Sequence, residues 1–499
     1  MPLIRTQAWW FRPALIIFIT LLLLWIGFAN SGVKVVILAT DALLGLLLAG
    51  LLFLVAYIRQ RPDLLDPWQQ VSKRRIPVAA GVILLTYAVI ALIDSVHFRV
   101  PLENAGHGDK VHYSVEVSSL LDKVLQQLRT QEESTYSAPF AIQLYSKEMI
   151  EQADGQMVRD YPRLKYGGAH LQHADERTAD IIRLTLVGSI KGVLLWSGLL
   201  IIVLVVRRRT TGTTTKQVWQ ALWHDPSTRM LRTALVTFLV VLLLASVAMQ
   251  LADVYHIFGT SKVGQDVFYQ AVKSIRTGLI IGTLTTLVML PFAILMGIAA
   301  GYFRGWIDDV IQYIYTTLNS IPGVLLIAAA ILSIQVYISN NPDIFETAAD
   351  RADLRLLALV LILGVTSWTG LCRLLRGEAL KIREMEYIQA AKAFGVSPFK
   401  VLGRHILPNV LHIVLIIVVL DFSGLVLAEA VLSYVGVGVD PSTISWGNMI
   451  NSARLEMARE PLVWWSLLAA FCFMFALVLA ANLFADAVRD AFDPRMRVS

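Results

Sequence analysis

The sequence has little cysteine and little charge. Its two cysteines, Cys372 and Cys472, lie in or beside apolar runs, and they form no disulfide framework or Cys/His metal motif. Charged residues make up 16% of the 499 residues, against roughly 25% in soluble domains. The pattern G-x-x-x-x-G-K-[ST] does not occur in the sequence, so a phosphate-binding loop of that kind is excluded.

Apolar residues take the place of the missing charges. They make up 56% of the chain, and the mean hydropathy is +0.63. Ten apolar blocks are close to the length of about 20 residues that a helix requires to cross a bilayer. The blocks cover residues 13–28, 35–57, 76–93, 184–206, 231–251, 277–300, 310–336, 354–375, 410–435 and 462–483. The sequence therefore predicts an all-α polytopic membrane protein, in which the first block is a signal anchor without a cleavage site.

Basic residues predict the orientation of these spans. The loop of residues 58–75 and the run Arg207-Arg208-Arg209 are typical of cytoplasmic segments. Both termini are then cytoplasmic, and the net charge of +6 requires no nucleic-acid partner. We divide the chain into spans one to three, an extracytoplasmic segment, span four with a linker, and spans five to ten. The boundaries are 1–96, 97–183, 184–229 and 230–499.

Residues 376–408 predict a helix–glycine–helix hairpin between spans eight and nine. The apolar side of its first helix, residues 383–394, carries Tyr387, Ile388, Ala391 and Phe394. Gly395 is typical of a left-handed helix end, Ser397-Pro398 begins a second helix, and Pro408 is expected to end it. A hairpin with both an apolar and a strongly polar side favours a protein partner, and an ordinary amphipathic connector is the alternative.

The hairpin resembles the EAA loop of permease subunits of binding-protein-dependent ABC importers. It has Gln389-Ala390-Ala391, then Gly395, then Ile406-Leu407-Pro408, and Gln389 stands where that family commonly has glutamate. In that family the hairpin docks into a groove on a separate ATPase subunit and transmits its motion. The resemblance implies a coupling role for Glu386, Gln389, Ala390, Ala391, Gly395, Ile406 and Pro408.

From about residue 230 the chain is similar to the second permease subunit of dipeptide, oligopeptide and nickel importers. The similar stretches are residues 256–267, 300–306, 428–438, 444–447 and 486–495. Ser261 and Gln265 replace an aspartate and an arginine of the family pattern, so an ion pair between those positions is absent here. The resemblance implies a type I importer permease core of six spans, preceded by a four-span N-terminal extension.

The same resemblance implies the partners. They are a second homologous permease, two ATPase subunits that bind ATP and Mg, an extracytoplasmic solute-binding protein, and the lipid of a bacterial inner membrane. This chain itself is expected to bind no cofactor or metal and to be no enzyme. Peptides are the expected substrates, and nickel or peptide-like antibiotics are the alternatives within the family.

Asp421 and Glu429 are candidate pathway residues, because carboxylates within a span are costly and are often functional. A structural role, in which Glu429 hydrogen-bonds a broken helix end near Gly436 and Gly438, is the alternative. An ion-driven secondary transporter would carry paired intramembrane charges and inverted repeats, and a membrane-bound enzyme would need a nucleophile or metal group. We find neither pattern.

Residues 97–183 are not explained by the resemblance. The segment contains five of the nine histidines, His97, His107, His112, His170 and His173. His170 and His173 have a spacing that can bind metal on a helix, but solvated surface histidines are the simpler interpretation. We expect a helix over 118–130 and a strand over 140–145, in a small domain or as extensions of spans three and four. Its location favours contact with the binding protein or the partner permease.

Overall fold

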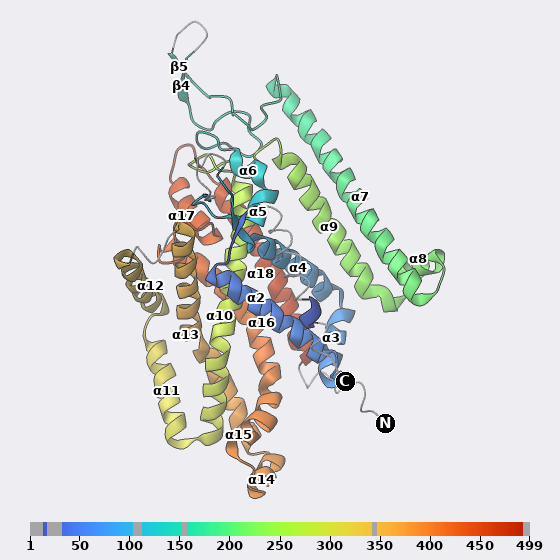
Figure 1. Cartoon of the computed structure of the whole chain (residues 1–499), viewed down its shortest axis with the longest axis vertical. Coiled ribbons are helices and arrows are strands. Elements are labelled where there is room, and N and C mark those ends of the chain that lie inside the picture. The colour runs from blue at the N-terminus through green and yellow to red at the C-terminus, as the bar shows by residue number, and fades with distance from the viewer. Residues whose placement is uncertain (1–12, 17–31, 103–111, 152–156, 342–346, 493–499) are drawn as a thin grey trace.

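The computed structural model describes residues 13–16, 32–102, 112–151, 157–341 and 347–492 (Figure 1). Within these ranges, nine helices are long and apolar enough to cross a membrane. They are α2 (Ala39–Ile58), α4 (Arg75–Asp94), α7 (Arg177–Thr211), α9 (Arg229–Ala252), α10 (Val267–Phe303), α12 (Gly323–Asn340), α13 (Ala348–Arg383), α16 (Leu407–Tyr434) and α18 (Trp465–Phe492). The all-α polytopic fold is thereby confirmed. Predicted span one lies largely outside the described residues.

The predicted seventh span is wrong in its extent, because the chain breaks near its middle. Residues 310–336 are divided between α11 (Gly305–Ser320) and α12, and Ile321 between them is extended with ψ 129°. The cause is Pro322, since a residue that precedes proline is driven out of the helical region. Several helices also continue beyond their apolar blocks, and α13 includes residues 376–383, which we assigned to the hairpin.

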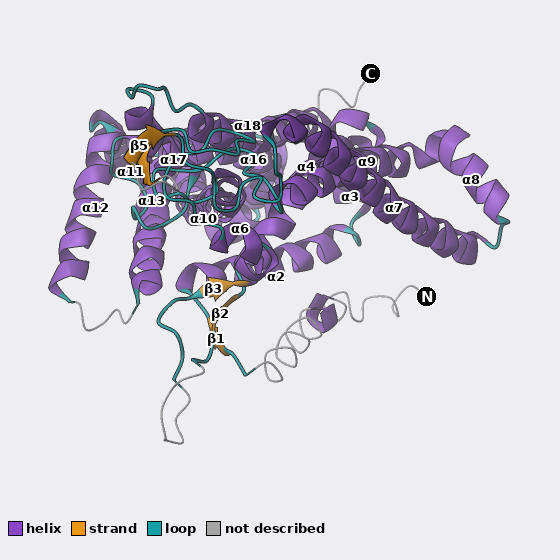
Figure 2. Cartoon of the chain, turned by 90° about the horizontal axis from the view of Figure 1, so that it is seen from above, coloured by secondary structure: helices purple, strands orange, loops and turns teal. Residues whose placement is uncertain are grey.

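The centre of the molecule is the pair α10 and α13, which pack along much of their length. Gly297 and Gly301 of α10 lie directly against α13, where a Cβ would meet the Cys372 and Arg376 carbonyl oxygens at 2.7 and 2.6 Å. Small residues of this kind allow two membrane helices to approach closely. Helices α16, α18 and α4 surround the pair, and the view from above places α12 and α8 (Thr215–His224) at opposite ends of the molecule (Figure 2).

The N-terminal helices are part of this bundle. Helix α2 packs on α10 and α13, and α4 packs on α18, α9 and α10. Helix α3 (Pro62–Lys73) lies on α18, where Trp68 contacts Phe492 edge to face. Helices α7 and α9 form an outer pair that α8 joins at one end (Figure 1).

The segment of residues 97–183, which we predict to be extracytoplasmic and name accordingly, contains little regular structure in its described residues. Strands β1 (Lys34–Val36), β2 (His97–Arg99) and β3 (Ser118–Ser119) form an antiparallel sheet, and β4 (Glu148–Glu151) pairs with β5 (Met157–Asp160). The expected helix over 118–130 is instead two short helices, α5 (Leu120–Val124) and α6 (Gln126–Thr130), because Leu125 leaves the helical conformation. The expected strand at 140–145 is also wrong: Phe140 has φ +56°, and this stretch makes only isolated bridges.

Candidate functional site

The hairpin lies at one end of the bundle, opposite the extracytoplasmic segment (Figure 1). It consists of α14 (Glu386–Ala393), a turn at Gly395, α15 (Pro398–Val401) and a π-helical turn, η4 (Leu402–Ile406). Gly395 has φ +73°, the left-handed conformation that glycine adopts without strain. The predicted helix–glycine–helix geometry is therefore present.

The predicted end of the second helix at Pro408 is wrong. The π-helical turn runs directly into α16, and the Leu407 N–H donates to the Leu402 carbonyl five residues earlier. Pro408 is the second residue of α16, a position where the missing N–H of proline costs little. The second limb of the hairpin and span nine are consequently one continuous helical segment, residues 398–434.

One side of the hairpin is anchored on the bundle. Ile388, Val401 and Ile406 are fully buried in a cluster with residues of α10, α13 and α16. Ala391 packs at the edge of this cluster. The amide of Gln389 donates to the Arg383 carbonyl at 3.1 Å and so caps the end of α13.

The other side of the hairpin is exposed and apolar at several positions. The Phe394 side chain is 87% exposed and that of Phe399 is 80% exposed. Glu386 and Ala390 are also exposed, as is Pro408. The structure thus places the predicted coupling residues in two groups: Ile406 and Ala391 face the bundle, whereas Glu386, Ala390, Gly395 and Pro408 face away from it.

Ion pairs connect the base of the hairpin to the neighbouring turn between α10 and α11. Arg376 of α13 donates to both carboxylate oxygens of Asp308, at 2.6 and 2.8 Å. Arg304 lies 3.6 Å from Glu384, and the Lys392 ammonium lies 5.0 Å from the centre of the Tyr302 ring. These contacts join the hairpin to the ends of α10, α11 and α13.

The two predicted pathway carboxylates are both on α16, but their surroundings differ. Glu429 is 2% exposed and accepts hydrogen bonds from Ser433 at 2.8 Å and from Ser445 at 3.0 Å. Ser445 caps α17 (Trp446–Glu456), so Glu429 joins the end of α16 to the start of α17. This environment favours the structural interpretation for Glu429. Asp421 is half-buried without an ion pair to a described residue, and its pathway role stays a prediction.

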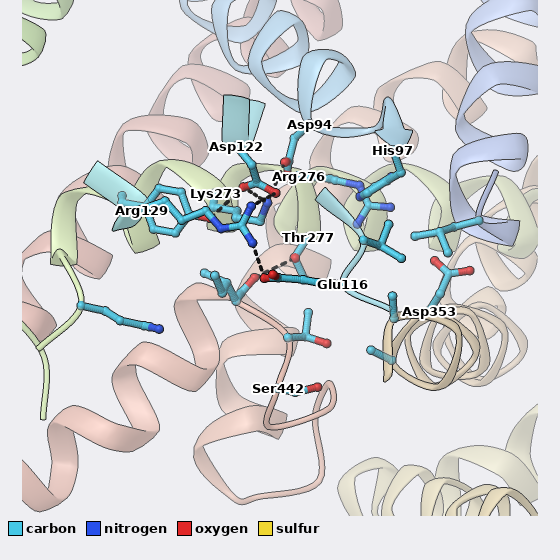
Figure 3. Close-up of a pocket in the computed structure, with 18 of the residues that line it drawn as sticks. Asp94, His97, Glu116, Asp122, Arg129, Lys273, Arg276, Thr277, Asp353 and Ser442 are labelled. Atoms are coloured by element: carbon cyan, nitrogen blue, oxygen red, sulfur yellow. Dashed lines mark hydrogen bonds and ion pairs between the residues drawn. The ribbon is translucent and has the colours of Figure 1, made fainter. Parts of the chain in front are cut away.

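A charged cavity of about 380 Å³ is lined by residues from the beginnings of α10 and α13 and from the extracytoplasmic segment (Figure 3). Lys273 of α10 reaches Asp94 of α4 at 3.1 Å and also contacts Asp122 of α5. Arg129 and Glu116 pair across its rim (Figure 3). The cavity thus connects the N-terminal helices and the extracytoplasmic segment to the start of α10.

A buried network forms another part of the wall of this cavity, which His97, Arg276 and Asp353 line. Arg276 donates to Asp41 of α2 at 2.5 Å, and His97 Nδ1 lies 2.8 Å from the same carboxylate. Asp353 of α13 accepts the backbone N–H of Thr40 at 3.2 Å. Asp41 has no role predicted from sequence, and the prediction that His97 is a solvated surface histidine is wrong because His97 is 8% exposed.

Sequence reasoning missed Lys273 and Arg276 because it began span six at residue 277. Helix α10 begins already at Val267, so both cations lie in its first turns. Their spacing of three residues, which places them on one side of a helix, was the available signal. Among the described residues, no group of three or more His, Cys, Asp or Glu side chains could hold a metal ion.

The extracytoplasmic segment contacts the loop before α10. This loop contains residues 256–267, the first of the stretches similar to importer permeases, and we call it the motif loop. His256 is buried between Asp266, at 2.7 Å from Nδ1, and Glu133, at 3.4 Å from Nε2. Glu133 also accepts backbone N–H groups of Lys165, Tyr166 and Gly167 at 2.8 to 3.1 Å. Glu133 therefore holds residues 165–167 of its own segment and also contacts the motif loop through His256.

Burial and pairing act in opposite directions on these groups. Burial alone would lower the pKa of His256, but hydrogen bonds to Asp266 and Glu133 outweigh it and raise the pKa to about 9. Burial alone would raise the pKa of Glu133, but hydrogen bonds from His256 and the three backbone N–H groups lower it to about 2. The imidazole is therefore a cation between two carboxylates at neutral pH.

Comparison with known proteins agrees with this architecture. The family described as binding-protein-dependent transport system inner membrane component matches residues 293–498, which include α11 to α18 and the hairpin. The dipeptide transport system permease protein DppC of Bacillus subtilis is 29% identical over 242 residues, 48% of this chain and 69% of that protein. The oligopeptide transport system permease protein OppC of Mycobacterium tuberculosis is 29% identical over 242 residues, 48% of this chain and 77% of that protein.

A putative peptide permease protein of Brucella suis is 30% identical over 246 residues, which are 49% of this chain and 74% of that protein. The similarity covers most of each relative and about half of this chain. The chain therefore belongs to the family of inner membrane components of binding-protein-dependent transport systems.

Proposed function

We propose that this chain is a permease subunit of an ATP-driven importer of di- or oligopeptides. It forms half of the translocation pathway, and a second homologous permease forms the other half. Two separate ATPase subunits bind ATP and Mg and carry out the hydrolysis, so this chain is not itself an enzyme. A solute-binding protein delivers the peptide on the extracytoplasmic side, and both termini lie in the cytoplasm.

The observation that carries the proposal is the hairpin. Its buried side is fixed to α10, α13 and α16, and its opposite side presents Phe394 and Phe399 almost fully exposed. Large exposed aromatic side chains on a short amphipathic unit are typical of a protein-binding surface. The permeases of Bacillus subtilis and Mycobacterium tuberculosis that resemble this chain are named for dipeptide and oligopeptide transport, which supports peptides as the substrate.

The proposal also accounts for the isolated position of α11 and α12. Their outward side chains include Tyr313, Val324, Leu332 and Val336, which are 41% to 74% exposed. Within the described residues, α12 packs mainly on α13. A second permease subunit beside α12 would bury this surface.

The test is ATP-driven uptake of a tripeptide by the complete transporter in proteoliposomes. Gly395→Pro forbids the observed φ of +73° because proline is restricted to negative φ, and Ala391→Trp overfills the edge of the buried cluster. We expect both variants to insert normally and to lose uptake. Gly377→Ala is the matched control, since no atom lies within 4 Å of its added Cβ. Normal uptake by Gly395→Pro at equal membrane abundance would contradict the coupling role.

A further inference from the structure

A second cavity lies beside α17, between the permease helices and the extracytoplasmic segment. Its volume is about 510 Å³, which is within the range of small-molecule sites. Tyr136 of the segment, the loop of residues 261–265 and the stretch of residues 441–456 form its walls. The cavity is therefore large enough for a short peptide.

The floor of this cavity contains an incompletely paired carboxyl group. Glu456, the last residue of α17, is 5% exposed, and its Oε1 accepts a hydrogen bond from the Tyr136 hydroxyl at 3.2 Å. Its Oε2 has no hydrogen-bond partner among the described residues, and neither does the neighbouring Ser466 hydroxyl, which is also 5% exposed. A buried carboxylate oxygen without a donor is costly, so this position favours a ligand that donates.

The rim of the cavity carries the opposite charge. Arg459 and Lys262 are exposed, and neither forms an ion pair with a described carboxylate. The Arg459 guanidinium lies 5.2 Å from the centre of the Tyr136 ring, which places it beside the residue that hydrogen-bonds Glu456. A guanidinium held in this way is well suited to a carboxylate.

We propose that this cavity binds a short peptide by its two charged ends, with Glu456 receiving the α-ammonium group and Arg459 with Lys262 receiving the α-carboxylate. This inference rests on the proposed peptide transport and names a site for the substrate on the permease itself. Glu456 lines the cavity although its Oε2 is buried, and rotation about the terminal bonds of the side chain, its softest torsions, would expose this oxygen to the ligand. Burial raises the pKa of Glu456 although hydrogen bonding and the positive charges of Arg459 and Lys262 oppose this shift, and a bound ammonium group would oppose it further.

The test measures binding of radiolabelled trialanine to the transporter in lipid nanodiscs without the solute-binding protein. We expect saturable binding that N-acetyl-trialanine does not displace, because acetylation removes the ammonium group. Glu456→Gln and Arg459→Gln should each weaken binding roughly tenfold or more. Glu460→Gln is the matched control, since this exposed carboxylate does not line the cavity, and it should leave binding unchanged.

The outcomes separate the site from the function. Trialanine uptake by the complete transporter without saturable binding here, or binding that neither variant weakens, would overturn the site and leave the function standing. Variants that loosen the solute-binding protein instead would show a docking surface and would also overturn the site. Absence of uptake for every peptide tested would overturn the function itself. If Glu456→Gln fails to assemble, the exposed Arg459 decides the question.

Discussion

The imidazolium of His256 holds the extracytoplasmic segment on the permease. It lies between Asp266 of the motif loop and Glu133 of the segment, so its charge joins two parts of the chain that are far apart in sequence. The His256 pKa is raised from 6.5 to about 9, and the Glu133 pKa is lowered from 4.5 to about 2. Both shifts make the strength of the attachment dependent on pH.

The first prediction at this scale follows from the signs of these shifts. The contribution of His256 is complete below pH 6.5 and is lost as the pH rises through about 9. The contribution of Glu133 is complete above pH 4.5 and is lost as the pH falls through about 2. The segment should therefore resist local opening best between these two limits, at pH 4.5 to 6.5.

Hydrogen exchange of residues 133–167, corrected for the intrinsic rate at each pH, measures this resistance. His256→Gln should abolish the alkaline decline while the protein remains folded. An alkaline decline of unchanged size in His256→Gln would show that another group is responsible.

A second prediction concerns the contact between Glu133 and the motif loop. Gly264 has φ +77°, and a Cβ built on it would lie 1.8 Å from the Glu133 carbonyl oxygen. Gly264→Ala should lower the free energy of unfolding by about 2 kcal/mol or more, from strain and collision together. Gly212→Ala is the matched control, because Gly212 has φ +67° with no atom within 4 Å of the added Cβ. Equal melting temperatures for the two variants would contradict the proposed collision.

At the scale of the element, the hairpin combines a fixed and a free surface. Phe394 lies just before the turn and Phe399 just after it, and both rings are exposed. Because the base of the hairpin packs on the bundle, these exposed rings are preorganised for a partner.

We therefore predict that Phe394→Ala and Phe399→Ala each weaken association with the ATPase subunits. Loss of one buried aromatic side chain costs about 2 kcal/mol, or roughly 30-fold in affinity. Purification of the assembled transporter at decreasing concentration measures the effect. Phe475→Ala, an exposed position on α18, should leave assembly unchanged. Retention of the ATPase by the double variant at every concentration would contradict the prediction.

The hairpin also shows how much of the structure could be predicted from sequence. Gly395 and Ser397-Pro398 determine local geometry, so the turn was predictable. Pro408 was misinterpreted because a proline in a first helical turn and a proline after a helix look the same in sequence, and only the π-helical turn separates them.

In the candidate site too, local features could be predicted from sequence, whereas contacts between distant residues could not. Nothing local indicated that Arg276 pairs with Asp41 or that Glu133 pairs with His256, since these pairs are separated by more than one hundred residues. The hydropathy pattern located the spans but not the break at Pro322, because residues 310–336 are apolar on both sides of it. Contacts that depend on the complete fold could not be predicted from local sequence patterns or from hydropathy.

At the scale of the whole molecule, the N-terminal helices complete the bundle. Arg276 is on α10 and Asp353 is on α13, yet their partners Asp41 and Thr40 are on α2. Removing residues 1–96 would leave two charged side chains without these partners beside the membrane interior, which is strongly unfavourable.

We therefore predict that one pair of substitutions changes the melting temperature in opposite directions in the truncated and the full-length protein. In residues 230–499 expressed alone, Arg276→Met with Asp353→Leu should raise the melting temperature in detergent, because it removes unpaired charges. In the full chain the same pair of substitutions should lower it, since Asp41 then retains only His97 as a partner. Thermal unfolding followed by size-exclusion chromatography measures both. A change of the same sign in the two proteins would show that the helices are independent.

The continuity of residues 398–434 has a mechanical consequence. At 1.5 Å per residue, this segment is about 55 Å long, and it carries the hairpin turn at one end and the Glu429–Ser445 hydrogen bond at the other. Between Leu407 and Tyr434 the helix is unbroken, and the π-helical turn of residues 402–406 is the place where the segment can bend. We therefore expect a displacement of the hairpin to swing the far end of the segment about this turn.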